Sequence, residues 1–175
     1  KKFVTGVPKP RLGEREEMVW KQFEESVVGC TTPYHVQVGD LFDTFVVPPE
    51  VVLRAAEIYS RGNPQTRYLT LRGNHDASRD TNKASSFDIF AELVSPLGNV
   101  LVVKDTPWEF IGYAFIPWHP FKSAKEQAQT LQGKYEAIFG HFDLESFGGS
   151  EHNLIPIEEL KRLTNTVVTG HIHTP

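Results

Sequence analysis

Two stretches of the chain share one construction, in which an apolar run stops at a glycine and metal-capable side chains follow at once. They read Val36-Gln37-Val38-Gly39-Asp40-Leu41-Phe42-Asp43 and Tyr68-Leu69-Thr70-Leu71-Arg72-Gly73-Asn74-His75-Asp76. This pattern is typical of strands that deliver ligands at the carboxyl edge of a sheet. Because one helix-length segment separates the two stretches, we expect Asp40, Asn74 and His75 to lie side by side.

The same pattern occurs twice more toward the end of the chain. An apolar run over 135–139 enters Gly140-His141, and a run over 166–169 enters Gly170-His171-Ile172-His173. His171 and His173 would point to opposite faces of an extended strand, but in a loop beyond a strand end they can converge. Together with Asp40 and Asn74 these histidines form a carboxylate, amide and imidazole set that suits zinc, manganese or iron.

Apolar periodicity and turn residues predict the remaining elements. We expect helices over 14–28, 48–60, 85–94, 123–132 and 157–163, and strands over 32–39, 67–71, 135–139 and 166–169. Met18, Val19, Phe23 and Val27 should form the apolar face of the first helix, and Phe87, Phe90 and Leu93 that of the third. Three short runs, 100–104, 108–111 and 113–116, predict antiparallel strands. Strands and helices alternating on both sides of a β-rich middle favour a layered α/β fold over a Rossmann unit.

Composition narrows the class of protein. A chain of 175 residues with 39% apolar and 23% charged residues suits one globular domain, residues 1–175. The net charge of −4 provides no basic field for nucleic acid, so local patches or bound metal would have to supply positive charge. The single cysteine, Cys30, excludes an intramolecular disulfide and a cysteine-rich zinc site. No run approaches the length of about 18 apolar residues that a membrane span needs. We expect a cytoplasmic protein without a membrane partner.

The four motifs in this order resemble those of the calcineurin-like metallophosphoesterases, over Val36 to His173. The resemblance implies a four-layer α-β-β-α sandwich. Within that superfamily the run Gly39-Asp40-Leu41-Phe42-Asp43-Thr44, the pair Pro48-Pro49 and the closing Gly-His-Ile-His are similar to the SbcD-type nuclease subunits of double-strand-break repair. Protein phosphatases of the superfamily instead tend to show Asp-Arg-Gly where this chain has Asp43-Thr44-Phe45.

The resemblance also implies roles for individual residues and a cofactor. Asp40 would bridge two divalent metal ions, manganese before iron or zinc. Asn74, His141 and His171 would complete one metal site, and His173 would serve the other. His75 would assist the leaving oxygen during in-line attack of hydroxide, with the carboxylate of Asp43 orienting its ring. Independently of the resemblance, Arg72 flanks the second metal loop and His119 follows a predicted strand. Both could therefore meet the substrate, although loop arginines are more often solvated.

Several alternatives stay open at this stage. Asp43 could hydrogen-bond its own backbone, and Asp76 is expected to cap the segment that follows it. The superfamily's first motif, an aspartate and a histidine one residue apart, is missing from the sequence. Either the chain lacks the first strand, which we favour, or the protein has lost that half of the site. Because SbcD-type chains continue beyond this point, we also expect that the C-terminal part of the fold is missing after Pro175.

By resemblance, the expected partners are DNA, an SbcC-like ATPase subunit and a second copy of the chain. A small-molecule phosphoesterase, for example one acting on cyclic nucleotides, and a metal-poor binding scaffold remain as alternatives.

Overall fold

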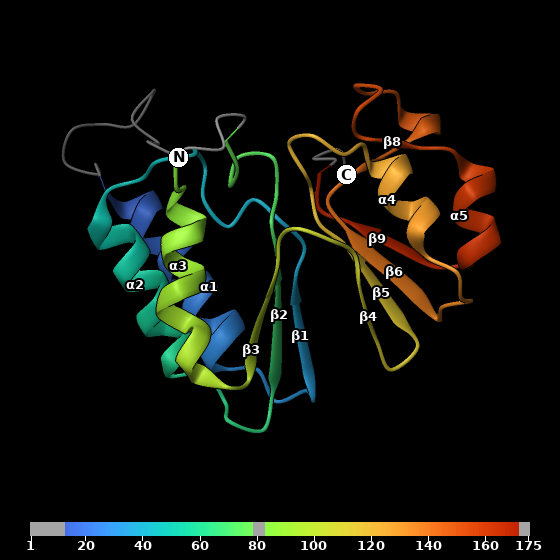
Figure 1. Cartoon of the computed structure of the whole chain (residues 1–175). Coiled ribbons are helices and arrows are strands. Elements are labelled where there is room, and N and C mark those ends of the chain that lie inside the picture. Colours follow the sequence, from blue (N-terminus) through green and yellow to red (C-terminus); the bar gives the residue numbers. More distant parts are fainter. Residues whose placement is uncertain (1–12, 79–82, 172–175) are drawn as a thin grey trace.

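A computed structural model describes residues 13–78 and 83–171 and arranges them in four layers (Figure 1). One outer layer holds the helices α1 (Glu14–Val28), α2 (Pro49–Ser60) and α3 (Ser86–Val94), followed by the short 3-10 helix η2 (Ser95–Leu97). They cover a parallel sheet of β1 (Tyr34–Gln37), β2 (Arg67–Leu71) and β3 (Val100–Val103), in that order. The layered α/β fold expected from the sequence is confirmed.

The second half of the chain builds the other two layers. A four-stranded sheet has the order β4 (Trp108–Phe110), β5 (Tyr113–Ile116), β6 (Ala137–Gly140) and β9 (Val167–Thr169). Only β4 and β5 pair antiparallel, and β5, β6 and β9 are parallel. The helices α4 (Ala124–Thr130) and α5 (Ile157–Leu163) cover its outer face (Figure 1). A small ribbon of β7 (Asp143–Leu144) and β8 (Leu154–Ile155), with the 3-10 helix η3 (Glu145–Phe147) between them, completes this half.

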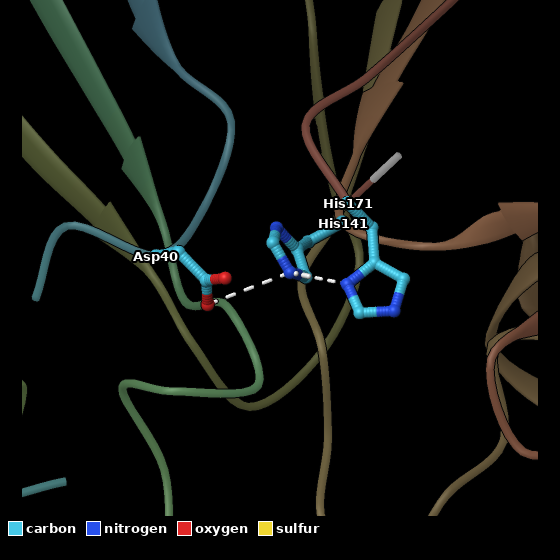
Figure 2. A group of neighbouring side chains, drawn as sticks. All are labelled: Asp40, His141 and His171. Atoms are coloured by element: carbon cyan, nitrogen blue, oxygen red, sulfur yellow. Dashed lines mark hydrogen bonds and ion pairs between the residues drawn. The ribbon is translucent and has the colours of Figure 1, made fainter. Parts of the chain in front are cut away.

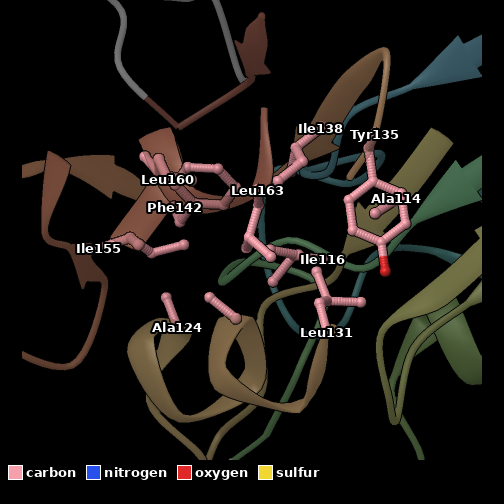
Figure 3. Close-up of a cluster of buried hydrophobic side chains, with 11 residues drawn as sticks. Ala114, Ile116, Ala124, Leu131, Tyr135, Ile138, Phe142, Ile155, Leu160 and Leu163 are labelled. Carbon is pink, nitrogen blue, oxygen red and sulfur yellow. The ribbon is translucent and has the colours of Figure 1, made fainter. Parts of the chain in front are cut away.

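Three apolar clusters fill the spaces between the four layers. Alternation along β2 shows how one strand serves two of them: Tyr68 packs in the cluster beneath α1–α3, whereas Leu69 and Leu71 pack against the second sheet. The third cluster lies between that sheet and the helices α4 and α5 (Figure 3). Because β2 is buried on both faces, it reads as a nearly continuous apolar run, which made its bounds predictable.

Local signals explain the helix ends. Ser85 begins α3 through a capping box with Asp88, and Ser123 begins α4 through the same arrangement with Glu126. Proline opens α2, where its missing N–H removes no hydrogen bond. None of the helices in the described residues is long and apolar enough to cross a membrane.

Two expectations about the elements are wrong. The strand β3 was expected to join the antiparallel group, but it lies parallel to β2 in the first sheet. The crossover through α3 brings the chain back beside β2, so that β3 runs in the same direction. The apolar faces also differ in detail. Met18 and Val19 are 53% and 45% exposed, and Leu93 is 42% exposed while Val94 is fully buried. Val94 follows Phe90 by four residues, the spacing that continues the buried face of α3.

The topology brings the four predicted loops together. β1 and β2 are parallel neighbours in one sheet, and β6 and β9 are parallel neighbours in the other. Parallel neighbours end at the same edge of a sheet, so each pair delivers two loops to one rim. The loops are joined across the two sheets by contacts of His141, which are described next.

Candidate metal centre

Four of the predicted ligands meet where the strand ends converge. Asp40, His141 and His171 each offer one ligand atom, and these three atoms all lie within 4.8 Å of one another (Figure 2). Nε2 of His141 is 3.5 Å from Oδ1 of Asp40 and 2.9 Å from Nδ1 of His171. Oδ1 of Asn74 is also 2.9 Å from that Nε2 atom. The predicted ligand His173 lies outside the described residues.

The proton on His141 is placed by its other ring nitrogen. Nδ1 of His141 lies 2.9 Å from the carbonyl oxygen of Val38, which can only accept, so Nδ1 carries the hydrogen. Nε2 therefore turns a lone pair toward the oxygen atoms of Asn74 and Asp40. Burial lowers the pKa of the His141 imidazole to about 4, so the ring is neutral at pH 7.

Lone pairs facing one another at this distance repel unless a cation lies between them. A carboxylate, an amide oxygen and two imidazoles are a donor set that manganese, iron and zinc accept. The residues present therefore fit a divalent metal ion. Asp40, Asn74, His141 and His171 would hold it.

A second set of residues contacts His171, and no motif of the sequence points to them. The indole Nε1 of Trp118 donates to Oδ1 of Asn153 at 2.7 Å, which turns the amide nitrogen of Asn153 toward Nε2 of His171 at 3.0 Å. The carboxylate of Asp143 lies 3.6 Å from the same Nε2 atom. Because Asn153 donates to Nε2, Nδ1 of His171 carries the hydrogen in this arrangement. Binding a metal through Nδ1 would require that hydrogen to move to Nε2, beside the carboxylate of Asp143, and the amide of Asn153 to turn away. Asp143 would then hold the ring in the metal-binding tautomer, as outer-shell carboxylates of metal sites generally do.

Asp76 ties the first two metal loops together. Its buried carboxylate accepts the backbone N–H groups of Leu41 at 3.1 Å, Phe42 at 2.9 Å and Gly73 at 2.9 Å. It was expected to cap the segment that follows it; instead, it binds the loop after β1 and the start of its own loop. Burial raises the pKa of Asp76 to about 6, although the three N–H donors act in the opposite direction.

Two glycines allow the loops to approach closely. A side chain at Gly39 would collide with the ring of His141, and one at Gly73 would collide with Asp40. Gly39 has φ 98° and Asp40 has φ 53°, so the first loop turns through left-handed backbone before it presents the carboxylate. This close approach is the physical reason for glycine before the ligand in both motifs.

His75 lies beside the cluster without belonging to it. Its backbone N–H donates to Oδ1 of Asp40 at 2.9 Å, and its side-chain Nε2 is 4.0 Å from Oδ2 of Asp40. Nδ1 of His75 lies 2.6 Å from the backbone carbonyl oxygen of Asp43. The orienting contact thus comes from the carbonyl of Asp43, whereas the sequence suggested its carboxylate. Because a carbonyl only accepts, Nδ1 carries the hydrogen and Nε2 faces the site.

The two residues expected to meet the substrate lie together on another side of the second metal loop. Arg72 is buried, and its Nε donates to the carbonyl oxygen of Trp118 at 3.1 Å. His119 follows Trp118 and lines the same cavity as Arg72. Arginines in loops are more often solvated, but Arg72 is buried.

Comparison with known proteins agrees with this geometry. Residues 17–175 match the family model described as calcineurin-like phosphoesterase. A search of curated proteins finds no match. The matched region contains all four strand-end motifs and every described residue of the site.

Proposed function

Because this chain belongs to the calcineurin-like phosphoesterase family, we propose that it is a nuclease subunit of the SbcD type that hydrolyses DNA phosphodiester bonds. Membership itself means metal-dependent hydrolysis of phosphoesters by an enzyme that uses divalent metal ions. The choice of DNA as substrate and of manganese as the preferred metal is our proposal.

The observation that carries the enzymatic part is the convergence of Asp40, Asn74, His141 and His171 from four strand ends. When bound, divalent ions supply Lewis-acid polarisation of a phosphoryl group and a water with a pKa near 7. Asp40 has two carboxylate oxygens at the centre of the cluster, the feature that a bridging ligand needs. Asn74 and the two histidines hold neutral donor atoms around it.

His75 is suited to act on the leaving group. Its Nδ1–H is fixed on the carbonyl of Asp43, so Nε2 is the only ring atom that can give or take a proton at the site. The side chain is 47% exposed, which leaves it within reach of a substrate. A protonated His75 would deliver the Nε2 proton to the departing oxygen, or stabilise its charge.

Sequence details favour DNA over other phosphoesters. Asp43-Thr44-Phe45 stands where protein phosphatases of the superfamily tend to carry Asp-Arg-Gly, and Pro48-Pro49 opens α2 directly after the first loop. By the same resemblance we propose an SbcC-like ATPase subunit and a second copy of the chain as partners, and the cytoplasm as location.

A small-molecule diester is the second candidate. The net charge of −4 favours it, because a polyanion gains nothing from an acidic protein away from the site. The metal centre would be the same for both substrates, so only the substrate itself distinguishes them.

A comparison of substrates tests the proposal. The protein, loaded with manganese, is incubated with a linear DNA duplex, with bis(p-nitrophenyl) phosphate and with cyclic AMP, and His75→Ala protein purified in parallel controls for contaminating nucleases. We expect the duplex to be degraded, and EDTA to stop the reaction. Hydrolysis of the small esters with intact DNA would refute the nuclease and establish the second candidate.

A further inference from the structure

A separate cavity adjoins the second metal loop. It has a volume of about 290 Å³, and its lining includes Arg72, Lys83, Asp88, Asp105, His119 and Phe121. Among the described residues, none of the proposed metal ligands lines it. Arg72 directly precedes Gly73-Asn74, so the loop that carries a metal ligand also forms one wall of this cavity.

Arg72 has a guanidinium nitrogen atom without a hydrogen-bond partner among the described residues. Its side chain is only 9% exposed, and in the described part of the chain Nη2 is buried without a hydrogen-bond partner. Nη1 is 3.4 Å from Oδ1 of Asp105, whose side chain is 68% exposed, so solvent weakens this ion pair. Burial lowers the pKa of Arg72, yet a guanidinium stays protonated in proteins. Buried charged groups are normally fully hydrogen-bonded, and Arg72, which lines the cavity, has one nitrogen that is not.

The other carboxylate of the cavity is already engaged. Oδ1 of Asp88 binds Nζ of Lys104 at 3.0 Å, and Oδ2 accepts from the backbone and hydroxyl of Ser85 at 2.9 Å each. Asp88 therefore acts on Arg72 through its charge alone, as Asp76 does. Lys83 adds a second cationic side chain to the lining.

His119 and Phe121 add a hydrogen-bond donor and an aromatic surface to the lining of the cavity. Nδ1 of His119 accepts the backbone N–H groups of Phe121 and Lys122, both at 3.0 Å, so a neutral ring offers Nε2–H as a donor. Burial and the nearby charge of Arg72 lower the pKa of His119 and favour this neutral ring. Phe121 is 57% exposed and meets His119 edge to face at 6.0 Å. Nucleobases stack on aromatic side chains that are open to solvent in this way.

We propose that this cavity binds a nucleotide of the substrate strand that neighbours the nucleotide at the metal centre, with its phosphate on Arg72 and His119 and its base against Phe121. The volume is near the lower limit of about 300 Å³ for small-ligand pockets, which suits a single nucleotide unit. The inference rests on the proposed function, because only a substrate with more than one phosphate can occupy the metal centre and the cavity at the same time. It favours an oligonucleotide over a simple diester.

Binding to the metal-free protein tests the cavity separately from the nuclease activity. EDTA-treated protein is titrated calorimetrically with thymidine 5′-monophosphate, inorganic phosphate and thymidine. We expect the nucleotide to bind more tightly than either part alone, and Arg72→Gln to weaken it at least tenfold, since it removes a charge-assisted contact. Arg61→Gln makes the same charge change at the end of α2, where the arginine pairs with Glu24, and should bind as the wild type does.

A second variant covers the case in which Arg72→Gln does not fold. Phe121→Ala removes an exposed ring and should weaken the nucleotide several-fold while leaving inorganic phosphate unchanged. Absence of binding to the wild type, equal binding by wild-type and Arg72→Gln protein, or equal effects of Phe121→Ala on nucleotide and phosphate would each overturn the proposal. Because no cleavage is measured, these results do not depend on whether the metal centre hydrolyses DNA.

Discussion

Replacing Asp76 with alanine should destabilise the protein by loosening both loops of the metal centre at once. The substitution leaves the N–H groups of Leu41, Phe42 and Gly73 without their acceptor. Each unsatisfied buried donor costs about 1–3 kcal/mol. The change also removes a carboxylate whose charged form is disfavoured in the fold: its pKa rises from 3.8 to about 6, which corresponds to about 3 kcal/mol. Three such donors cost about 3–9 kcal/mol together, so the net loss expected at pH 7 is about 0–6 kcal/mol and centres near 3 kcal/mol.

The pH dependence has a definite sign. The folded pKa of Asp76, about 6, lies above the unfolded value of 3.8, so the folded state binds this proton more readily. In metal-free protein, protonation of Asp76 should therefore increase the unfolding free energy of the wild type as the pH falls from about 6 to about 4. Asp76→Ala lacks this gain, so the difference between the two proteins should widen over that range.

Urea denaturation of EDTA-treated protein, followed by tryptophan fluorescence, measures both effects. Hydrogen exchange provides the local readout, because the amides of Leu41, Phe42 and Gly73 should exchange much faster in Asp76→Ala. Glu57→Ala serves as the control, because this carboxylate is 69% exposed and makes a long, weak ion pair of 4.0 Å with Arg61. A loss below 1 kcal/mol at pH 7 with unchanged exchange at the three amides would refute the reasoning.

Three further substitutions separate the roles within the site. His75→Ala should keep metal binding but lower turnover by about 10²–10⁴-fold; a kcat equal to the wild type would remove it from the chemistry. Asp40→Asn should lower the metal content found by elemental analysis, and normal content would exclude a bridging role. Asp143→Ala should weaken metal affinity by about tenfold in a calorimetric titration, because His171 loses the carboxylate that can accept its Nε2 hydrogen when Nδ1 binds the metal. An unchanged metal affinity in this variant would contradict this account.

The sequence predicted the parts of the fold that repeat a strong local pattern. The bounds of β2 and α5 were predicted to the residue, and α1 and α2 within one residue, because apolar runs, acidic first turns and Pro49 mark them. The partner of β3 was not predictable in this way. A short apolar strand carries no signal of its neighbour, and only the packing of α3 decides that β3 pairs with β2.

The ligand cluster was predictable for a similar reason. A glycine followed by a ligand at each strand end is a local feature, and parallel neighbours bring such ends together. The partners of those ligands are not local. Asn153 reaches His171 from the loop before β8, and Trp118 reaches Asn153 across 35 positions of sequence. Neither belongs to a recognisable motif, so only the tertiary structure connects them with the site.

The role of Asp76 shows a third case. The residue stands inside a motif, yet the sequence favoured a capping role toward the following segment. The structure turns its carboxylate back toward Leu41 and Phe42, more than thirty positions earlier in the chain. The unpaired N–H groups of a tight loop, which a sequence does not reveal, decide where a buried carboxylate binds.

The most direct test of the metal centre is a calorimetric titration of EDTA-treated protein with manganese, comparing the wild type with His141→Ala. His141 is buried and contributes Nε2 at the middle of the cluster, so its removal should abolish binding at that site. We predict at least one ion bound per wild-type chain and a loss of that ion in the variant. A wild type that binds no manganese, or a variant that binds it equally well, would contradict the account of how these four strand ends form a metal site.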